Sequence, residues 1–182
     1  DLLVSATAAA RTRPGFERIV GSLYNFSIFR DELDPAADFA AFARAVAATV
    51  AEALAHQDYP ILRLMEEVEP GFIGRPSVLD QVGFHMLRPE NLDDRGMGAI
   101  LLNEAGGRLS FGSLGIETLA IPKEGTFREF TVFQIEHDGR LHLTLRCDAD
   151  LFGEATADRL LGEYVAMLER CVATPEATLA AL

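Results

Sequence analysis

The chain has 182 residues, 49% of them hydrophobic, and a formal net charge of −12 from 16 basic and 28 acidic residues. This length and composition are typical of one compact domain with a substantial core and exclude a disordered chain. The acidic balance, without a cluster of Lys and Arg that could neutralise phosphates, argues against nucleic acid as a partner.

The two cysteines and the N-terminal residues indicate the cellular compartment of the protein. Cys147 and Cys171 form no C-x-x-C pair, and two cysteines are too few for a secreted disulfide scaffold. The apolar start at Leu2 breaks off at Arg11, which is too short for a signal peptide or a membrane span. We therefore expect a cytoplasmic protein that does not enter a membrane. A chain that begins with Asp1 rather than Met also suggests a fragment of a longer protein.

The first half of the chain predicts two strands followed by two helices. Leu2–Ala6 and Leu23–Phe29 are short, apolar and rich in residues that favour strands. Asp34 is a good N-cap with Pro35 at the first helical position, and apolar residues then recur at three- and four-residue steps. This helix should end near His56. A second helix is expected over Ile61–Val68.

The second half predicts mainly strands and turns, closed by one long helix. Strand candidates are Val78–Leu87 and Ala99–Leu102, and 108–127 shows only short strands and turns. The clearest hairpin joins strands at 129–136 and 141–148, because Asp-Gly within the connection favours a tight turn. A final amphipathic helix should run from Glu154 to Val172. Together these elements predict an α+β fold, a two-layer sandwich in which helices cover a mixed sheet.

Local motifs for independent chemistry are missing from the sequence. Ser22 and Ser27 lack a G-x-S-x-G elbow, so a hydrolase triad has no support. No histidine or cysteine spacing matches a metal site, and we expect no bound metal. The glycines near Gly106 do not form a G-x-G-x-x-G motif that would cradle a phosphate.

Two segments resemble conserved blocks of a known family. They are Ile19–Arg30, which reads IVGSLYNFSIFR, and His56-Gln57-Asp58-Tyr59-Pro60. In this order and separation they resemble blocks in the C-terminal half of peptide-synthetase condensation domains, which join carrier-bound acyl groups by forming amide bonds. The family carries its catalytic His-His-x-x-x-Asp-Gly motif in the N-terminal half, and this sequence contains no such motif. The resemblance therefore implies the C-terminal lobe, residues 1–182, of a bilobed fold like that of chloramphenicol acetyltransferase.

The resemblance assigns a role to Arg11. The family's Ala-Gly-Arg at the end of a strand reads Ala9-Ala10-Arg11 here. In the family that arginine forms an ion pair between the lobes with the Asp of the catalytic motif, a role that suits an always-charged guanidinium. The alternative is that Arg11 is a turn arginine that contacts a local carboxylate, and Arg13 is a substitute for the inter-lobe role.

The resemblance also implies a substrate channel beside the first block. The family's Gly-x-Phe-Val-Asn-Thr corresponds to Gly21 and Asn25, with Arg30 closing the block, while Tyr24 and Phe26 depart from the usual Val and Thr. An amide in an apolar strand needs partners, which a thioester or pantetheine in a tunnel would supply. Asn25, Tyr24 and Ser27 are therefore candidate channel residues. The alternative for Asn25 is bonding to neighbouring backbone.

The second block matches the family residue for residue over His56, Gln57, Asp58, Tyr59 and Pro60. A helix end, Asp58 as a local hydrogen-bond acceptor and Pro60 as a stop explain this block by architecture, without catalysis. The next family block, Arg-x-x-Ser-Arg-x-Pro-Leu-Phe, survives only in part over 74–79. That erosion indicates a divergent member.

The implied function is one half of a condensation domain in a nonribosomal peptide synthetase. Its partners would be the N-terminal lobe and the donor and acceptor peptidyl carrier proteins. No cofactor would bind directly, because the carrier proteins deliver phosphopantetheine. The lobe alone should be inactive, and 106–125 is the candidate element that crosses to the other lobe. Two alternatives stay open: an ester-forming acyltransferase or epimerising relative of the same fold, and an inactive module that recruits carrier proteins or tailoring enzymes.

Overall fold

The computed structural model describes residues 1–72, 77–87, 95–121, 126, 128–137 and 139–182. Its strands are β1 (Leu2–Ala8), β2 (Asn25–Asp31), β3 (Val82–Leu87), β4 (Arg108–Phe111), β5 (Leu114–Glu117), β6 (Phe130–His137) and β7 (Arg140–Cys147). Its helices are α1 (Phe39–Ala55), α2 (Ile61–Val68), α3 (Arg95–Leu102) and α4 (Glu154–Ala173). Short 3₁₀ turns lie at Phe16–Arg18 and Val78–Asp80. The predicted α+β class with a mixed sheet and covering helices is confirmed.

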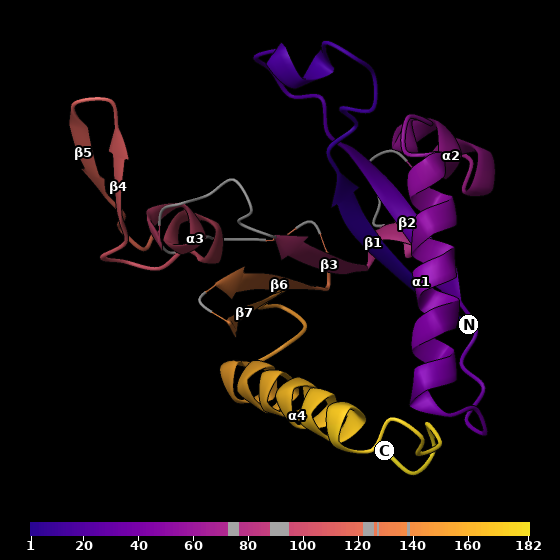
Figure 1. Cartoon of the computed structure of the whole chain (residues 1–182). Coiled ribbons are helices and arrows are strands. Elements are labelled where there is room, and N and C mark those ends of the chain that lie inside the picture. Colours follow the sequence, from indigo (N-terminus) through magenta and orange to yellow (C-terminus); the bar gives the residue numbers. More distant parts are fainter. Residues whose placement is uncertain (73–76, 88–94, 122–125, 127, 138) are drawn as a thin grey trace. The chain divides into compact units, whose positions relative to one another are not determined.

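The chain folds as two compact units, Asp1–Gly83 with Asp158–Leu182, and Phe84–Ala157. In the first unit β1 pairs antiparallel with β2, from Leu2 opposite Asp31 to Ala8 opposite Asn25. β1 also pairs in parallel with the start of β3, where Ser5 lies opposite Gly83. Helix α1 runs alongside β2 (Figure 1). Antiparallel and parallel pairs therefore meet on the same strand, which makes the sheet mixed.

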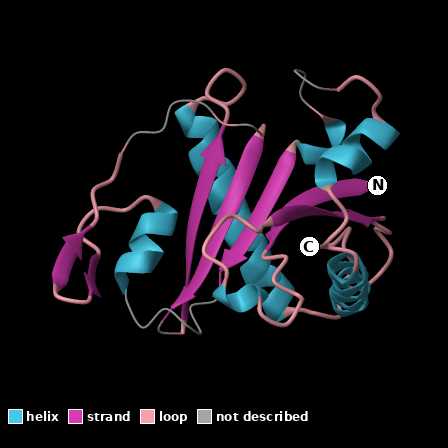
Figure 2. Ribbon diagram, turned by 90° about the horizontal axis from the view of Figure 1, so that it is seen from above, coloured by secondary structure: helices cyan, strands magenta, loops and turns pink. Residues whose placement is uncertain are grey.

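In the second unit β6 lies between β3 and β7. β6 and β7 form the predicted hairpin, with Gly139 at φ 67 in its turn. Only Gly takes this left-handed conformation without a steric cost. The turn is two residues shorter than the segment expected from the sequence, because pairing continues to His137 and Arg140. The small hairpin β4–β5 lies beside α3, away from β6 and β7 (Figure 2).

The predicted start of the first helix was wrong. Helix α1 begins at Phe39, and the N-cap is Asp38, whose carboxylate accepts from the Ala41 N–H at 2.7 Å. Asp34 instead caps a turn through the Ala36 N–H. The C-terminal tail explains the shift, because the carbonyls of Ala177 and Pro175 accept from the first N–H groups of the helix. Those N–H groups have no intrahelical partner, so the tail supplies what a cap normally supplies.

Two other expectations need correction. Ala99–Leu102 belongs to α3 rather than to a strand, since a four-residue apolar run does not distinguish the two. The expected strand over Val78–Leu87 is only partly correct. Its first residues form a 3₁₀ turn in which Ser77 Oγ accepts from the Leu79 N–H at 3.1 Å. Strand β3 begins after this turn.

The other elements confirm the sequence expectations closely. Helix α2 has the predicted bounds, α1 ends one residue before His56, and α4 ends one residue beyond Val172. Strand β1 begins at Leu2 as expected and ends two residues later than expected, and β2 begins and ends two residues later than expected, an ordinary boundary error. The turn-rich stretch from 108 contains β4 and β5 as expected, while 122–125 and 127 lie outside the described residues.

Candidate functional site

The segment His56–Pro60 joins α1 to α2 and is the centre of the candidate site. His56 is the C-cap of α1, and its N–H donates to the carbonyls of the last turn. The Tyr59 N–H then donates to the His56 carbonyl, and Pro60 is the N-cap of α2. The family-like block therefore lies at the helix boundary, as its architectural interpretation expects.

Asn25 ties this junction to β2. Its amide nitrogen donates to the carbonyls of Gln57, at 2.9 Å, and Tyr59. Its carbonyl oxygen accepts from the Ile61 N–H at 3.2 Å, at the start of α2. One side chain thus satisfies two carbonyls between the helices and one N–H at a helix start. This is the backbone-bonding alternative for Asn25.

Asn25 and Ser27 lie on the helix-facing side of β2. Alternation along a strand places them on the same face as Asp31, and Asp31 accepts from Thr49 Oγ1 of α1 at 2.7 Å. The Ser27 hydroxyl is buried and has no hydrogen-bond partner in the described part of the chain. The channel role predicted for both residues is not tested by these contacts and stays a prediction.

Tyr24 differs from these two residues in its exposure. It is 58% exposed, and its ring contacts Phe26 edge to face with 5.7 Å between centroids. Of the three predicted channel residues it is therefore the one whose side chain is open to solvent. Its role in a channel also stays a prediction.

Gln57 and Asp58 connect the helix junction to the segment that follows β1. Gln57 Oε1 accepts from the Ala10 N–H at 3.2 Å, and Gln57 Nε2 donates to the Leu54 carbonyl at 2.9 Å. Asp58 lies 3.7 Å from the Arg13 guanidinium in an exposed ion pair. Ala10 has φ 49, a left-handed conformation that costs an L-residue with a Cβ about 1–2 kcal/mol.

Arg11 organises the loop between β1 and β2. Its Nη1 donates to the carbonyls of Phe16 and Ile19, the latter at 3.0 Å, and its Nη2 donates to the carbonyl of Gly21 at 3.1 Å. Gly21 has φ 155, where a side chain would be strained, and this explains a glycine in the block. Arg11 therefore has local partners, but they are carbonyls rather than carboxylates. The predicted ion pair with another lobe is not tested by them.

Arg30, which closes the first block, pairs with the first residue of the chain. Its Nε and Nη2 donate to the two oxygens of the Asp1 carboxylate at 3.0 and 2.8 Å. The pair joins the end of β2 to the start of β1, at the opposite end of the hairpin from Asn25. Both side chains are more than half exposed, so its stabilising effect is small.

Near the junction, three polar side chains meet on the surface of α2. Glu67 Oε1 accepts from the Tyr59 hydroxyl at 2.9 Å and from Arg63 Nε at 3.1 Å. The hydrogen bond from Arg63, and then that from Tyr59, lower the pKa of the Glu67 carboxyl. The bond to Glu67 raises the pKa of Arg63. The cluster holds the Tyr59 ring against α2 and involves no buried charge.

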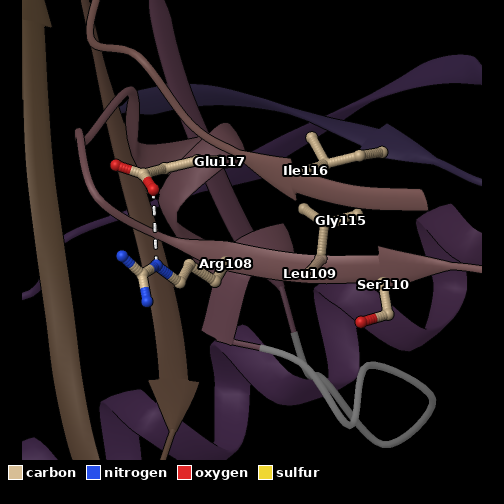
Figure 3. Close-up of a pocket in the computed structure, with 6 residues that line it drawn as sticks. All are labelled: Arg108, Leu109, Ser110, Gly115, Ile116 and Glu117. Carbon is tan, nitrogen blue, oxygen red and sulfur yellow. Dashed lines mark hydrogen bonds and ion pairs between the residues drawn. The ribbon is translucent and has the colours of Figure 1, made fainter.

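The second unit carries a pocket of about 350 Å³ on the β4–β5 hairpin. Figure 3 shows Arg108 and Glu117 facing each other across the two strands, with Leu109 and Ile116 further along. Arg108 Nε donates to Glu117 Oε2 at 3.3 Å. Arg108, Ile116 and Glu117 are at least partly exposed, and Ser110 is the only other polar side chain that lines the pocket. This lining offers an open surface that carries one ion pair.

The sequence did not reveal a row of planar side chains in the second unit. The His85 and Phe133 rings stack with 5.0 Å between centroids, and the Arg146 guanidinium lies 4.6 Å from the Phe133 centroid. The three residues come from β3, β6 and β7, so only the strand pairing could have identified them. Such stacks stabilise a sheet face by cation–π and aromatic contacts.

Other chemistry is not supported by the described residues. They contain no group of three or more His, Cys, Asp or Glu side chains placed to hold a metal ion. Burial raises the pKa of the Cys147 thiol, which makes it a poor nucleophile at neutral pH. None of the helices in the described ranges combines the length and apolar character that crossing a membrane requires.

Comparison with known proteins gives one consistent result. The family model described as "Condensation domain" matches residues 1–182. One of the chains of the linear gramicidin synthase of Brevibacillus parabrevis is 30% identical over 183 residues, covering 100% of this chain and 3% of the relative. A surfactin synthase chain of Bacillus subtilis is 26% identical over 97% of this chain and 4% of the relative. The chain therefore spans only a small part of the length of these curated relatives.

Solved structures share the fold. A four-domain nonribosomal peptide synthetase in its holo form, bound to AMP and glycine, aligns with a TM-score of 0.86 at 22% identity, covering 100% of this chain and 14% of that one. The condensation domain of the polyketide synthase MokA aligns with a TM-score of 0.73 at 17% identity, covering 98% of this chain and 38% of that one.

Proposed function

Because this chain belongs to the condensation domain family, we propose that it forms the C-terminal lobe of such a domain in a nonribosomal peptide synthetase. The complete domain would join a donor acyl or aminoacyl thioester to an acceptor amine in an amide bond. One observation carries the proposal: the family model matches all 182 residues, yet the sequence has no His-His-x-x-x-Asp-Gly motif. The catalytic histidine would then belong to the other lobe.

The reaction requires two carrier-bound substrates. The acceptor amine would attack the thioester carbonyl, forming the C–N bond as the C–S bond breaks, and the donor thiol would leave with the proton from the amine. Phosphopantetheine arms of donor and acceptor carrier proteins would deliver both substrates, so this lobe would hold no cofactor of its own. Its contribution would be a tunnel wall and a docking surface for the carriers.

The contacts of Arg11 are compatible with a second partner across the lobes. A guanidinium has five N–H donors, and the three bonds to carbonyls involve Nη1 and Nη2 but not Nε. The Nε–H has no partner in the ranges that the structure describes. Nε and Nη2 form the edge of a guanidinium that can bind a carboxylate in a bidentate pair. This geometry supports the inter-lobe ion pair without loss of the loop contacts.

Tyr24 is the best supported of the proposed channel residues. Asn25 already bonds three backbone groups, and Ser27 lies beneath α1, whereas Tyr24 is exposed. An exposed ring beside Phe26 offers an apolar wall with one hydroxyl that can contact an acyl chain or pantetheine. We keep Asn25 and Ser27 as secondary candidates.

The hairpin β4–β5 supports the crossing element proposed over 106–125. Its strands carry exposed apolar side chains, of which Phe111 is 74% and Leu114 63% exposed. Leu119, just after β5, is 76% exposed. Large apolar side chains concentrated on one short hairpin are typical of a surface that another part of a protein covers. In the complete domain that part would be the N-terminal lobe.

The test uses the full-length protein that carries this chain. With donor and acceptor loaded on carrier proteins, mass spectrometry should detect the amide product with the full-length protein and none with residues 1–182 alone, which lack the His-His-x-x-x-Asp-Gly motif and its catalytic His. Product formed by the isolated chain would overturn the assignment of lobes. A full-length protein that binds carriers but forms no product would favour the recruitment module instead.

A further inference from the structure

The backbone after β1 is strained next to Arg11, the residue proposed to pair with the other lobe. Ala10 adopts φ 49, and Arg11 follows it directly. Ala10 is one of only two non-glycine residues with positive φ in the described part of the chain. Such strain persists where surrounding contacts hold the backbone in place, and it is often found at functional sites.

Gln57 supplies the side-chain contact that holds Ala10. Its Oε1 accepts from the Ala10 N–H, which turns away from the β1–β2 ladder at this point. Gln57 is itself fixed on two sides, because its Nε2 donates to the Leu54 carbonyl and its backbone carbonyl accepts from Asn25. The acceptor for Ala10 is thus anchored to both α1 and β2.

Arg11 directly follows Ala10, so the left-handed backbone at Ala10 sets the direction in which the chain enters Arg11. From this position the guanidinium donates to the carbonyls of Phe16, Ile19 and Gly21. The exposed ion pair between Arg13 and Asp58 adds a second, weaker connection to the same helix junction.

We propose that Gln57 is a positioning residue, whose Oε1 holds the strained Ala10 backbone and so orients the Arg11 guanidinium. This inference rests on the proposed function, in which Arg11 pairs with a carboxylate of the other lobe. It gives the block at 56–60 a role beyond ending a helix. The block connects α1, α2 and β2 to the turn that presents Arg11.

Two substitutions separate this role from simple helix capping. Gln57→Glu keeps an oxygen for the Ala10 N–H but loses the donor to Leu54, and it adds a negative charge at the C-terminal end of α1, which is unfavourable there. Gln57→Lys keeps a donor for the Leu54 carbonyl but loses the acceptor for Ala10. If Gln57 only caps the helix, Gln57→Glu should impair the protein more than Gln57→Lys. If Gln57 positions Ala10 and Arg11, Gln57→Lys should impair it more.

The experiment measures both variants in the full-length protein. We expect Gln57→Lys to lower kcat for amide formation about tenfold with little change in KM, as for one lost hydrogen bond, and Gln57→Glu to stay within about threefold of wild type. Hydrogen exchange of peptides covering 9–18 should be faster in Gln57→Lys and near wild type in Gln57→Glu. Peptides covering β6 and β7 should exchange as in wild type in both variants, which checks that the fold is intact.

A double substitution tests the link to Arg11. In an Arg11→Ala background, Gln57→Lys should cause no further loss of rate, because the two residues act through the same guanidinium. Additive losses, or the reverse order of the Glu and Lys variants in exchange, would overturn the positioning role. A wild-type protein that forms no amide would refute the proposed function instead, and the exchange data would still decide the inference.

Discussion

The helix junction, residues 56–61, and the β4–β5 hairpin differ in whether their functional groups find partners within this chain. At the junction, Asn25 and Gln57 bond backbone groups of α1, of α2 and of Ala10, which follows β1, so its polar groups find partners within the first unit. On the hairpin, Phe111 and Leu114 stay exposed. Substitutions at the junction should therefore reduce the stability of this chain. Substitutions on the hairpin should leave the stability of this chain unchanged and weaken only its contact with the part of the protein that covers it.

The largest expected effect is at Asn25. Asn25→Leu removes three hydrogen bonds to partly buried backbone and should lower the free energy of unfolding of the condensation domain by about 2–4 kcal/mol. Asn25→Asp keeps an acceptor for the Ile61 N–H but places a carboxylate oxygen against the Gln57 and Tyr59 carbonyls, so it should also be destabilising at neutral pH. The measurement is the urea-unfolding midpoint beside the rate of amide formation. An unchanged midpoint with a slower rate would mean that Asn25 contacts substrate and that its backbone bonds are dispensable.

A smaller effect of opposite sign is expected at Ala10. Ala10→Gly should raise the free energy of unfolding by about 1 kcal/mol, because Gly adopts positive φ without a Cβ clash. The matched control is Ala9→Gly, a neighbour without positive φ, which should lower it by about 0.5–1 kcal/mol through the entropy of the unfolded chain. If both glycines destabilise equally, the left-handed backbone at Ala10 is not a source of strain.

A pH-dependent effect is expected at Glu67, and it should be smaller still because the carboxyl is exposed. Its pKa is lowered in the folded state, so its stabilising contribution is present above the unfolded pKa and is lost as pH falls through the folded pKa. Glu67→Gln should therefore lower the urea midpoint at about pH 7, and this loss should shrink as the pH falls through the folded pKa of Glu67. In an Arg63→Met background, the difference in urea midpoint between the protein with Glu67 and its Glu67→Gln variant should be smaller at neutral pH. An equally large difference in acid would show that the charge of the Glu67 carboxylate is not its cause.

The fold could be predicted where sequence signals were local and did not compete. Helix α2 has the predicted bounds because Pro60 precedes its apolar pattern and Pro70 follows it. The start of α1 could not be predicted, since Asp34 and Pro35 give a start signal but the tail near Ala177 binds the helix four residues later. A contact between residues so far apart in sequence leaves no local pattern.

The same distinction applies to the candidate site. The block at 56–60 was identified as an architectural helix end, and it lies at the end of α1. Its side-chain partners could not be predicted, because Gln57 and Ala10 are 47 residues apart and a half-buried glutamine has no characteristic sequence pattern. The row of His85, Phe133 and Arg146 was missed for a similar reason, since strand pairing alone brings the three together.

The smallest expected effect on stability is at Phe111, and it sharpens the comparison most directly. Phe111 is 74% exposed, so Phe111→Ser should change the free energy of unfolding by no more than about 0.5 kcal/mol. Leu102→Ala is the control for a buried apolar residue in the same unit, 6% exposed, and should cost about 2–5 kcal/mol.

Activity should separate Phe111 from an ordinary surface residue. If the hairpin crosses to the other lobe, Phe111→Ser in the full-length protein should slow amide formation although the fold of this chain is intact, because the apolar contact with the partner lobe is lost. Phe111→Ser would therefore slow amide formation without changing the free energy of unfolding. By contrast, Ala10→Gly would raise the free energy of unfolding and Asn25→Leu would lower it. A Phe111→Ser protein with wild-type rate and wild-type stability would show that the hairpin is covered by no lobe that the reaction needs.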